Sequence, residues 1–146
     1  MEEMITIRVY DAVNNIYYDK EVPYEYDIKK GKADKFAELE TYIAGLKEQG
    51  VKYEMDDDEE IWFKCDDEAM NNIIQTSMMI DVLLPVTWFT RNGEQGYIIL
   101  ETKEEWQKFM GTLANKMAEI KNKYYTYKYA IEQAKTEEEL KNITFE

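Results

Sequence analysis

The sequence predicts an α+β fold in which small antiparallel β-hairpins pack against amphipathic helices. Short β-rich runs alternate apolar and polar residues, and longer stretches carry apolar residues three or four positions apart. Turn residues separate the short runs in pairs, which is typical of hairpins. The expected order is ββα-ββ-α-ββ-α-α, ending in one long heptad-patterned helix and a short terminal helix.

The chain begins with a predicted hairpin. Ile5–Tyr10 alternates apolar and polar residues, and Asn14-Asn15 is typical of a turn. A second β-rich run follows and ends at Pro23. We therefore expect residues 4–11 to pair with residues 16–22.

The next segment predicts an amphipathic helix and two short strands. Residues 29–31 are expected to continue the loop after the hairpin, and the helix is expected over 32–49, with Gly50 as its stop. Residues 51–54 and 61–64 read as short strands on either side of an acidic loop. The apolar residues of this helix are Phe36, Leu39, Ile43 and Leu46.

A second helix and a third hairpin follow. Asp66-Asp67 offers an N-cap for a helix that should run to about Leu83. Beyond it, Val86–Thr90 and Tyr97–Leu100 flank Asn92-Gly93, a strong hairpin signal, with a bulge or longer loop expected because the gap is long. The expected apolar face of the helix consists of Met70, Ile73, Ile74, Met78 and Val82.

The last third of the chain is the most regular. Thr102–Glu105 is a capping box ahead of a helix of about four heptads, and Thr136–Glu139 is a second box that should start a short helix through Ile143. Two sets of residues, each seven apart, form an a/d seam. They are Trp106, Leu113, Ile120, Tyr127 and Ala134, and Met110, Met117, Tyr124 and Ile131.

The seam has two possible partners. It can pack against the helix at 32–49, whose apolar spacing matches, or against the same helix of another copy, which would give a homo-oligomer. We expect intramolecular burial near Trp106–Leu113 and contact with another chain in the Tyr-rich half, 124–131, because Tyr is enriched at interfaces. The candidate contact residues there are Tyr124, Tyr127 and Ile131.

Composition argues against several classes of function. The chain has 146 residues, a net charge of −13, no histidine and one cysteine, Cys65. The negative charge disfavours direct nucleic-acid and anionic-membrane binding. Without histidine or a cofactor fingerprint, we expect no catalytic residues, no cofactor and no metal centre.

The sequence also predicts the domain organisation and the location of the protein. We expect residues 1–146 to form one unit, with a possible sub-boundary near residue 66. The acidic start, Met1–Met4, does not read as a signal peptide, and no apolar stretch approaches the roughly 20 residues of a membrane span.

Residues 54–68 carry the sharpest charge feature, nine acidic residues against Lys64 alone. Three interpretations stay open: a solvated loop that aids solubility, a mimic of a nucleic-acid backbone, and a site for a hard cation. The cation interpretation is weak, because the acids are contiguous and the glycine of a calcium loop is absent. The candidate interaction residues are Asp56, Asp57, Asp58, Glu59 and Glu60.

Two adjacent aromatic pairs occur in strand-like runs, Trp62-Phe63 and Trp88-Phe89. Neighbouring residues of a strand point to opposite faces, so one ring of each pair should be in the core and the other nearer solvent. The outer ring is either covered by a helix or offered to a partner, and Trp88 is a candidate contact residue.

From about residue 66 to residue 146 the chain resembles an uncharacterised domain found toward the C-terminal end of tailed-bacteriophage tail proteins. The elements that carry the resemblance are Asn71–Gln75, Val86–Phe89 with Asn92-Gly93, Thr102–Trp106 and Ala130–Leu140. The resemblance implies a phage or prophage origin, a tail-associated role, and location in the virion or the host cytoplasm. It implies no catalytic residues, and it does not extend to residues 1–65.

Two functional hypotheses follow. The first is a non-enzymatic tail or virion component that docks on, or bridges, other phage proteins. The second is a small acidic inhibitor that binds a host nucleic-acid enzyme or defence protein by mimicking nucleic-acid charge. The seam and the Trp-bearing hairpin favour the first, and the cluster at 54–68 favours the second.

Replacing Asp56, Asp57 and Asp58 with Asn separates these interpretations of the acidic segment. If the segment is a solvated loop, stability and partner association should change little, because exposed charges contribute little individually. Stopped-flow association at several salt concentrations provides the measurement. A strong fall in on-rate with a flatter salt dependence would support mimicry instead, and a melting temperature raised by millimolar calcium would support the cation site.

Overall fold

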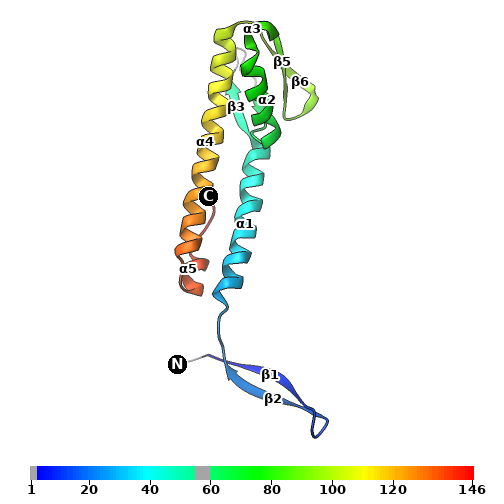
Figure 1. Ribbon diagram of the computed structural model, residues 1–146, viewed down its shortest axis with the longest axis vertical. Helices are drawn as coiled ribbons and strands as arrows, with labels where there is room; N and C mark the ends of the chain where they lie inside the picture. Colours follow the sequence, from blue (N-terminus) through cyan, green and yellow to red (C-terminus); the bar gives the residue numbers. More distant parts are fainter. Residues whose placement is uncertain (1–2, 55–59) are drawn as a thin grey trace.

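The computed structural model describes residues 3–54 and 60–146. Two long helices, α1 (Ile28–Gln49) and α4 (Lys103–Gln133), run antiparallel as a shaft (Figure 1). Two hairpins and two short helices form a head at one end of the shaft, and the N-terminal hairpin projects beyond the other end. The predicted α+β class, with one long C-terminal helix and a short terminal helix, is confirmed.

The strands of the described residues pair as three separate antiparallel hairpins. They are β1 (Met4–Asp11) with β2 (Ile16–Pro23), β3 (Val51–Glu54) with β4 (Glu60–Phe63), and β5 (Val86–Thr90) with β6 (Gly93–Leu100). The shorter helices are α2 (Asp67–Met78), α3 (Ile80–Leu83) and α5 (Glu137–Lys141).

Helix α1 begins earlier than the sequence pattern predicted. Residues 29–31 were expected in a loop, but they belong to its first turn, because the Asp27 carboxylate caps the helix by accepting the Lys30 N–H at 3.2 Å. The helix ends at Gly50, whose φ of 73° is left-handed. A Cβ there would lie 1.7 Å from the Phe63 carbonyl oxygen, so only glycine fits between α1 and the β3–β4 hairpin.

The predicted single helix over 66–83 is interrupted. Asp66 caps it by accepting the Ala69 N–H at 2.9 Å, but α2 ends at Met78, and α3 restarts after Met79. The expected apolar face is also wrong in part, because only Ile73 of its members is buried. The helix lies at the margin of the head, so its remaining apolar members stay exposed. These are Met70, Ile74, Met78 and Val82.

The head encloses a cluster of aromatic rings around Phe109 of α4, which is fully buried. Its ring centroid lies 5.4 Å from that of Tyr53 on β3 and 5.0 Å from that of Phe63 on β4. On the other side it lies 5.5 Å from Trp88 on β5 and 6.1 Å from Trp106 on α4. Phe109 lies off the predicted seam and was missed, because two hairpins cover this end of α4 and widen its buried face.

Arg91, in the turn between β5 and β6, joins the two hairpins of the head. Its N–H donates to the Trp62 carbonyl at 2.9 Å, and its guanidinium lies 5.0 Å from the Trp62 ring. The same side chain donates to the Gln49 carbonyl at 3.1 Å. A bulge follows Phe89 of β5, as the long gap predicted, and the turn itself has only two residues.

The shaft buries the heptad seam within one chain. Residues Leu113, Met117 and Ile120 of α4 are buried, as are Leu39 and Ile43 of α1. The expected intramolecular partner, the helix at 32–49, is therefore the one observed. The core crosses residue 66 without interruption, since Phe63 and Phe109 are in contact.

Truncation of the seam should destabilise the protein to the same extent at every protein concentration, because the partner of the seam is in the same chain. Leu113→Ala is expected to lower the free energy of unfolding by about 2–5 kcal/mol. Urea denaturation followed by circular dichroism measures this loss. Tyr129→Ala, an exposed position on the same helix, should change it by less than about 0.5 kcal/mol. A loss that varied with concentration would show that the seam packs against another chain.

Candidate protein-interaction surfaces

The N-terminal hairpin, residues 4–23, is called the arm below. Its register places Ile5 opposite Val22 and Val9 opposite Tyr18, and directly opposed residues lie on the same side of a sheet. One face of the arm is therefore predominantly apolar, with Lys20 opposite Ile7 at its centre and Asp11 opposite Ile16 at its turn end as its charged residues. This apolar face consists of Ile5, Ile7, Val9, Ile16, Tyr18 and Val22.

The opposite face of the arm is polar and internally paired. Arg8 and Asp19 are directly opposed and form an ion pair at 3.6 Å. The rings of Tyr10 and Tyr17, the next pair along, lie 5.0 Å apart between centroids. This division into two faces is typical of a hairpin that is covered on one side.

The turn of the arm is held by its own hydrogen bonds. The Asp11 carboxylate accepts the Val13 N–H at 3.0 Å and both the backbone and side-chain N–H groups of Asn14, at 3.2 and 2.8 Å. The bonds from Asn14 lower the pKa of Asp11 below its ordinary value. Asn15 adopts a φ of 55° and accepts the Tyr10 hydroxyl. These hydrogen bonds define the shape of the turn without support from the helices.

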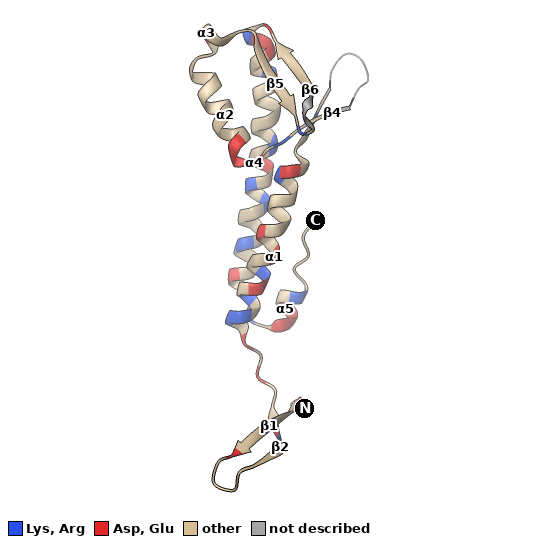
Figure 2. Ribbon diagram, turned by 90° about the vertical axis from the view of Figure 1, so that its right-hand side faces the viewer, with Lys and Arg blue, Asp and Glu red and all other residues tan. Residues whose placement is uncertain are grey.

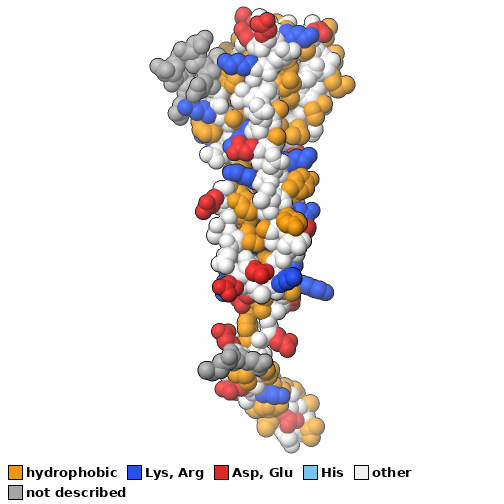
Figure 3. Space-filling model, turned by 90° about the vertical axis from the view of Figure 1, so that its left-hand side faces the viewer, with side chains coloured by type: hydrophobic (Ala, Val, Ile, Leu, Met, Phe, Trp, Pro, Cys, Tyr) orange, Lys and Arg blue, Asp and Glu red, His pale blue; other side chains and the backbone are white. Residues whose placement is uncertain are grey.

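The apolar face of the arm is not covered by the body of the protein. None of residues 4–23 belongs to the hydrophobic core or packs against it. Ile5, Ile16 and Tyr18 are 42%, 52% and 44% exposed. Figure 3 shows hydrophobic side chains on the surface of the arm, and Figure 2 shows the arm set apart from the long helices. A two-stranded hairpin alone is marginally stable in water, so this face fits a partner surface.

A second exposed apolar surface lies on the head. Met70, Ile74 and Met78 are four residues apart on one side of α2, and Met78 is 79% exposed. Methionine-rich surfaces adapt to partners of different shape, because the side chain is flexible and polarisable. The surface continues onto α3 through three further exposed residues, Met79, Val82 and Leu83. We call these six residues the methionine surface.

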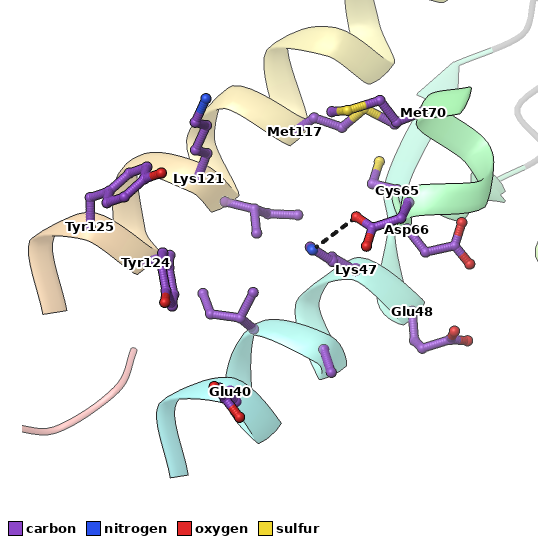
Figure 4. A pocket seen from close by; sticks show the side chains of 14 residues that line it. Glu40, Lys47, Glu48, Cys65, Asp66, Met70, Met117, Lys121, Tyr124 and Tyr125 are labelled. Atoms are coloured by element: carbon purple, nitrogen blue, oxygen red, sulfur yellow. Dashed lines mark hydrogen bonds and ion pairs between the residues drawn. The ribbon is translucent and has the colours of Figure 1, made fainter. Parts of the chain in front are cut away.

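A groove of about 610 Å³ runs between α1, α4 and the start of α2. Figure 4 shows Cys65, Met70 and Met117 gathered at one end of it. At its rim, Lys47 forms an ion pair with Asp67 at 3.2 Å. Burial raises the pKa of the Cys65 thiol to about 11, so the sulfur is protonated at neutral pH. The groove offers apolar surface rather than an activated nucleophile.

The predicted contact residues of the Tyr-rich half of α4 are used within the chain. Ile131 is fully buried, so it is not available to another chain. The Tyr127 ring lies 5.0 Å from Phe145, and its hydroxyl donates to the Glu146 carbonyl at 3.2 Å. Tyr124 is half-buried, with its ring 5.3 Å from Tyr125. The C-terminal segment folds back on the shaft and contacts Tyr127, which the heptad pattern could not indicate.

The other predicted contact residues are placed differently. Trp88 points inward, with its ring centroid 5.7 Å from that of Trp106, and its neighbour Phe89 is the exposed ring of the pair. Residues 56–59 of the acidic segment lie outside the described residues. Glu60 is described only as the first residue of β4, opposite Glu54.

Within residues 3–54 and 60–146, no group of three or more acidic or cysteine side chains is arranged to hold a metal ion. No helix of the same ranges is long and apolar enough to cross a bilayer. The chain matches no family model, no curated protein and no solved structure. The exposed apolar residues of the arm and of the methionine surface make these two the candidate interaction surfaces. Alternation in residues 4–22 indicated the apolar face of the arm, but not that it is uncovered.

Cys65 should react slowly with thiol reagents in the folded protein. Burial and a pKa of about 11 leave little thiolate at pH 7–8, and the thiolate fraction rises only as the pH approaches that value. Iodoacetamide labelling followed by mass spectrometry is expected to be slow in buffer and complete in denaturant. Cys65→Ser should remove labelling under both conditions. Rapid labelling of the native protein at pH 7 would contradict the buried position.

Proposed function

We propose that this protein is a non-enzymatic docking component of a bacteriophage or prophage particle, associated with the tail or another part of the virion, and that it acts through protein–protein contacts. The uncovered apolar face of the arm carries the proposal. The resemblance of residues 66–146 to a domain of phage tail proteins supplies the setting. The absence of histidine from the sequence and the protonated Cys65 thiol support a non-catalytic role.

The arm presents enough apolar surface for specific binding. Full burial of one side chain of the size of Val or Ile contributes about 1.5–3 kcal/mol. Association costs an estimated 4–15 kcal/mol in lost freedom, so several such side chains must be buried together. No single residue of the apolar face offsets this cost, but the six residues buried together can do so.

The arm and the methionine surface lie at opposite ends of the elongated molecule (Figure 1). Two separated apolar surfaces can engage two different neighbours at once, so the shaft acts as a spacer between them. We therefore favour a bridging role within the particle over attachment at a single site. The net charge of −13 favours neighbours with basic rims around their apolar contacts.

The alternative is a small acidic inhibitor of a host nucleic-acid enzyme or defence protein. Its specific support is the charge of −8 in the sequence of residues 54–68. Under that proposal the association rate should fall steeply with salt, because the attraction would be electrostatic. Apolar docking through the arm predicts a weak salt dependence.

Substitution of the apolar face should prevent incorporation into particles. Tyr18→Ser with Val22→Ser removes two members of this face on β2, away from the shaft and its core. Particles purified from a host carrying the gene should contain the native protein, and we expect at least a tenfold loss for the double variant by quantitative mass spectrometry.

The matched control is Tyr17→Ser with Glu21→Ser, on the polar face of the same strand, which should incorporate normally. In both variants the head and the shaft should unfold at the same melting temperature as in the native protein. Particles that lack the native protein, or that contain both variants equally, would contradict the proposal.

A further inference from the structure

The two outer edges of the arm can be assigned from one hydrogen bond. Tyr24 N–H donates to the Glu3 carbonyl at 2.8 Å, and the register of the hairpin places these two residues directly opposite each other. In an antiparallel pair, hydrogen-bonded and non-hydrogen-bonded pairs alternate. The odd-numbered residues of β1 therefore bond to β2. The N–H and C=O groups that point away from β2 belong to Met4, Thr6, Arg8 and Tyr10.

The outer edge of β2 is protected against further strand pairing. Its outward backbone groups belong to the residues opposite those of β1, namely Tyr17, Asp19, Glu21 and Pro23. Pro23 has no N–H to donate, and the two carboxylates would face each other if two copies paired here. Proline and charge are the usual means by which proteins block an edge strand.

The outer edge of β1 has no such protection. It contains no proline and no acidic residue between Met4 and Tyr10, and Arg8 is its single charge. Its apolar members, Ile5, Ile7 and Val9, alternate without interruption on one face. A β-branched edge with a single charge and no proline is a template for pairing with another strand.

The β1 sequence is complementary to itself when two copies run antiparallel about Ile7. Ile5 then faces Val9 of the second copy and Ile7 faces its own equivalent, so the apolar faces of both arms become continuous. Thr6 faces Arg8, and Met4 faces Tyr10, on the polar side. These last pairs use the outward backbone groups identified above, so each can exchange two hydrogen bonds.

Neighbouring registers are less favourable. The outward groups lie on even-numbered residues, so only registers that pair even with even positions satisfy them. A register centred on Arg8 places two guanidinium groups directly opposite each other, which is destabilising. A register centred on Thr6 leaves Tyr10 opposite a residue that lies before the start of β1, so Tyr10 has no partner within the strand. The register centred on Ile7 pairs all of residues 4–10 without opposing like charges among them, and the like charges of Glu3 and Asp11 meet only at the two margins of the paired segment.

We propose that the free edge of β1 pairs with β1 of a second copy of this chain, giving a four-stranded antiparallel sheet in the order β2-β1-β1-β2. A sheet of three or more strands with an apolar face is independently stable, whereas a two-stranded hairpin is marginal. Met4 of one copy lies beside Tyr10 of the other, so the helical bodies extend from opposite ends of the shared sheet. The inference uses the edge of the arm, whereas the proposed function rests on its face.

Disulfide trapping tests both the pairing and its register, in full-length protein carrying Cys65→Ser. Ile7→Cys places two thiols opposite each other in a non-hydrogen-bonded pair, where Cβ atoms approach to about 4.5–5.5 Å and small adjustments allow a disulfide. We expect most of this variant to form a covalent dimer under mild oxidation. Ile5→Cys, the control, faces Val9 and should remain monomeric on non-reducing gels. The absence of an Ile7→Cys cross-link, or equal cross-linking at both positions, would overturn the proposal.

Charge variants test the same register without a covalent bond. Thr6→Glu places a carboxylate opposite Arg8 of the second copy, and Thr6→Lys places a second positive charge there. The dimer dissociation constant from analytical ultracentrifugation should differ roughly tenfold between them, with the Glu variant tighter. Glu21→Lys on the β2 edge should leave it unchanged. A native protein that stays monomeric at all concentrations would overturn the pairing. If the protein forms the dimer but is absent from purified particles, only the proposed function is contradicted.

Discussion

The structure of the head and the shaft depends on the packing of one long helix, α4, against the other elements of both. Helix α4 supplies Trp106 and Phe109 to the head and Met117 and Ile120 to the shaft, and all four are buried. The ring of Phe109 contacts aromatic rings from both hairpins of the head. Two small hairpins, each too short to be stable by itself, are held in place because they share this aromatic surface.

The arm differs from the rest of the chain because it does not pack against α4 or its core. The body has a continuous apolar core, and among the described residues it buries no polar or charged side chain. The arm lies outside this core and relies on its turn, one exposed ion pair and one aromatic pair. Exposed ion pairs contribute at most about 1 kcal/mol, so burial of its apolar face against a partner would stabilise the arm further. The function we propose and the second copy we infer both supply such a partner.

Charge and apolar surface have separate roles in this arrangement. Acidic and basic residues are interspersed along the shaft (Figure 2), which is typical of a helix surface that faces solvent. The apolar surfaces lie at the ends, on the arm and on α2 and α3. Under the proposed function, partners bind at the two ends of the molecule, and the shaft sets the distance between the two binding surfaces.

Local chemistry in the sequence determined the elements and many of their limits. The capping residues Asp66, Thr102 and Thr136 accept the N–H groups expected of them, and Gly50 ends α1. The hairpins formed because period-two runs flank turn residues. These features depend on neighbours within a few positions, so the sequence alone is sufficient to predict them.

Only the tertiary structure decided which apolar faces are covered. The sequence predicted an apolar face on α2 and another on the arm, yet Met78 and Tyr18 are exposed, and Ile131 of the expected interface is buried. Periodicity reports that a face exists, because it reflects the geometry of one element. Whether that face meets α4, the returning C-terminal segment or solvent depends on where distant elements are placed, and no local spacing encodes that placement.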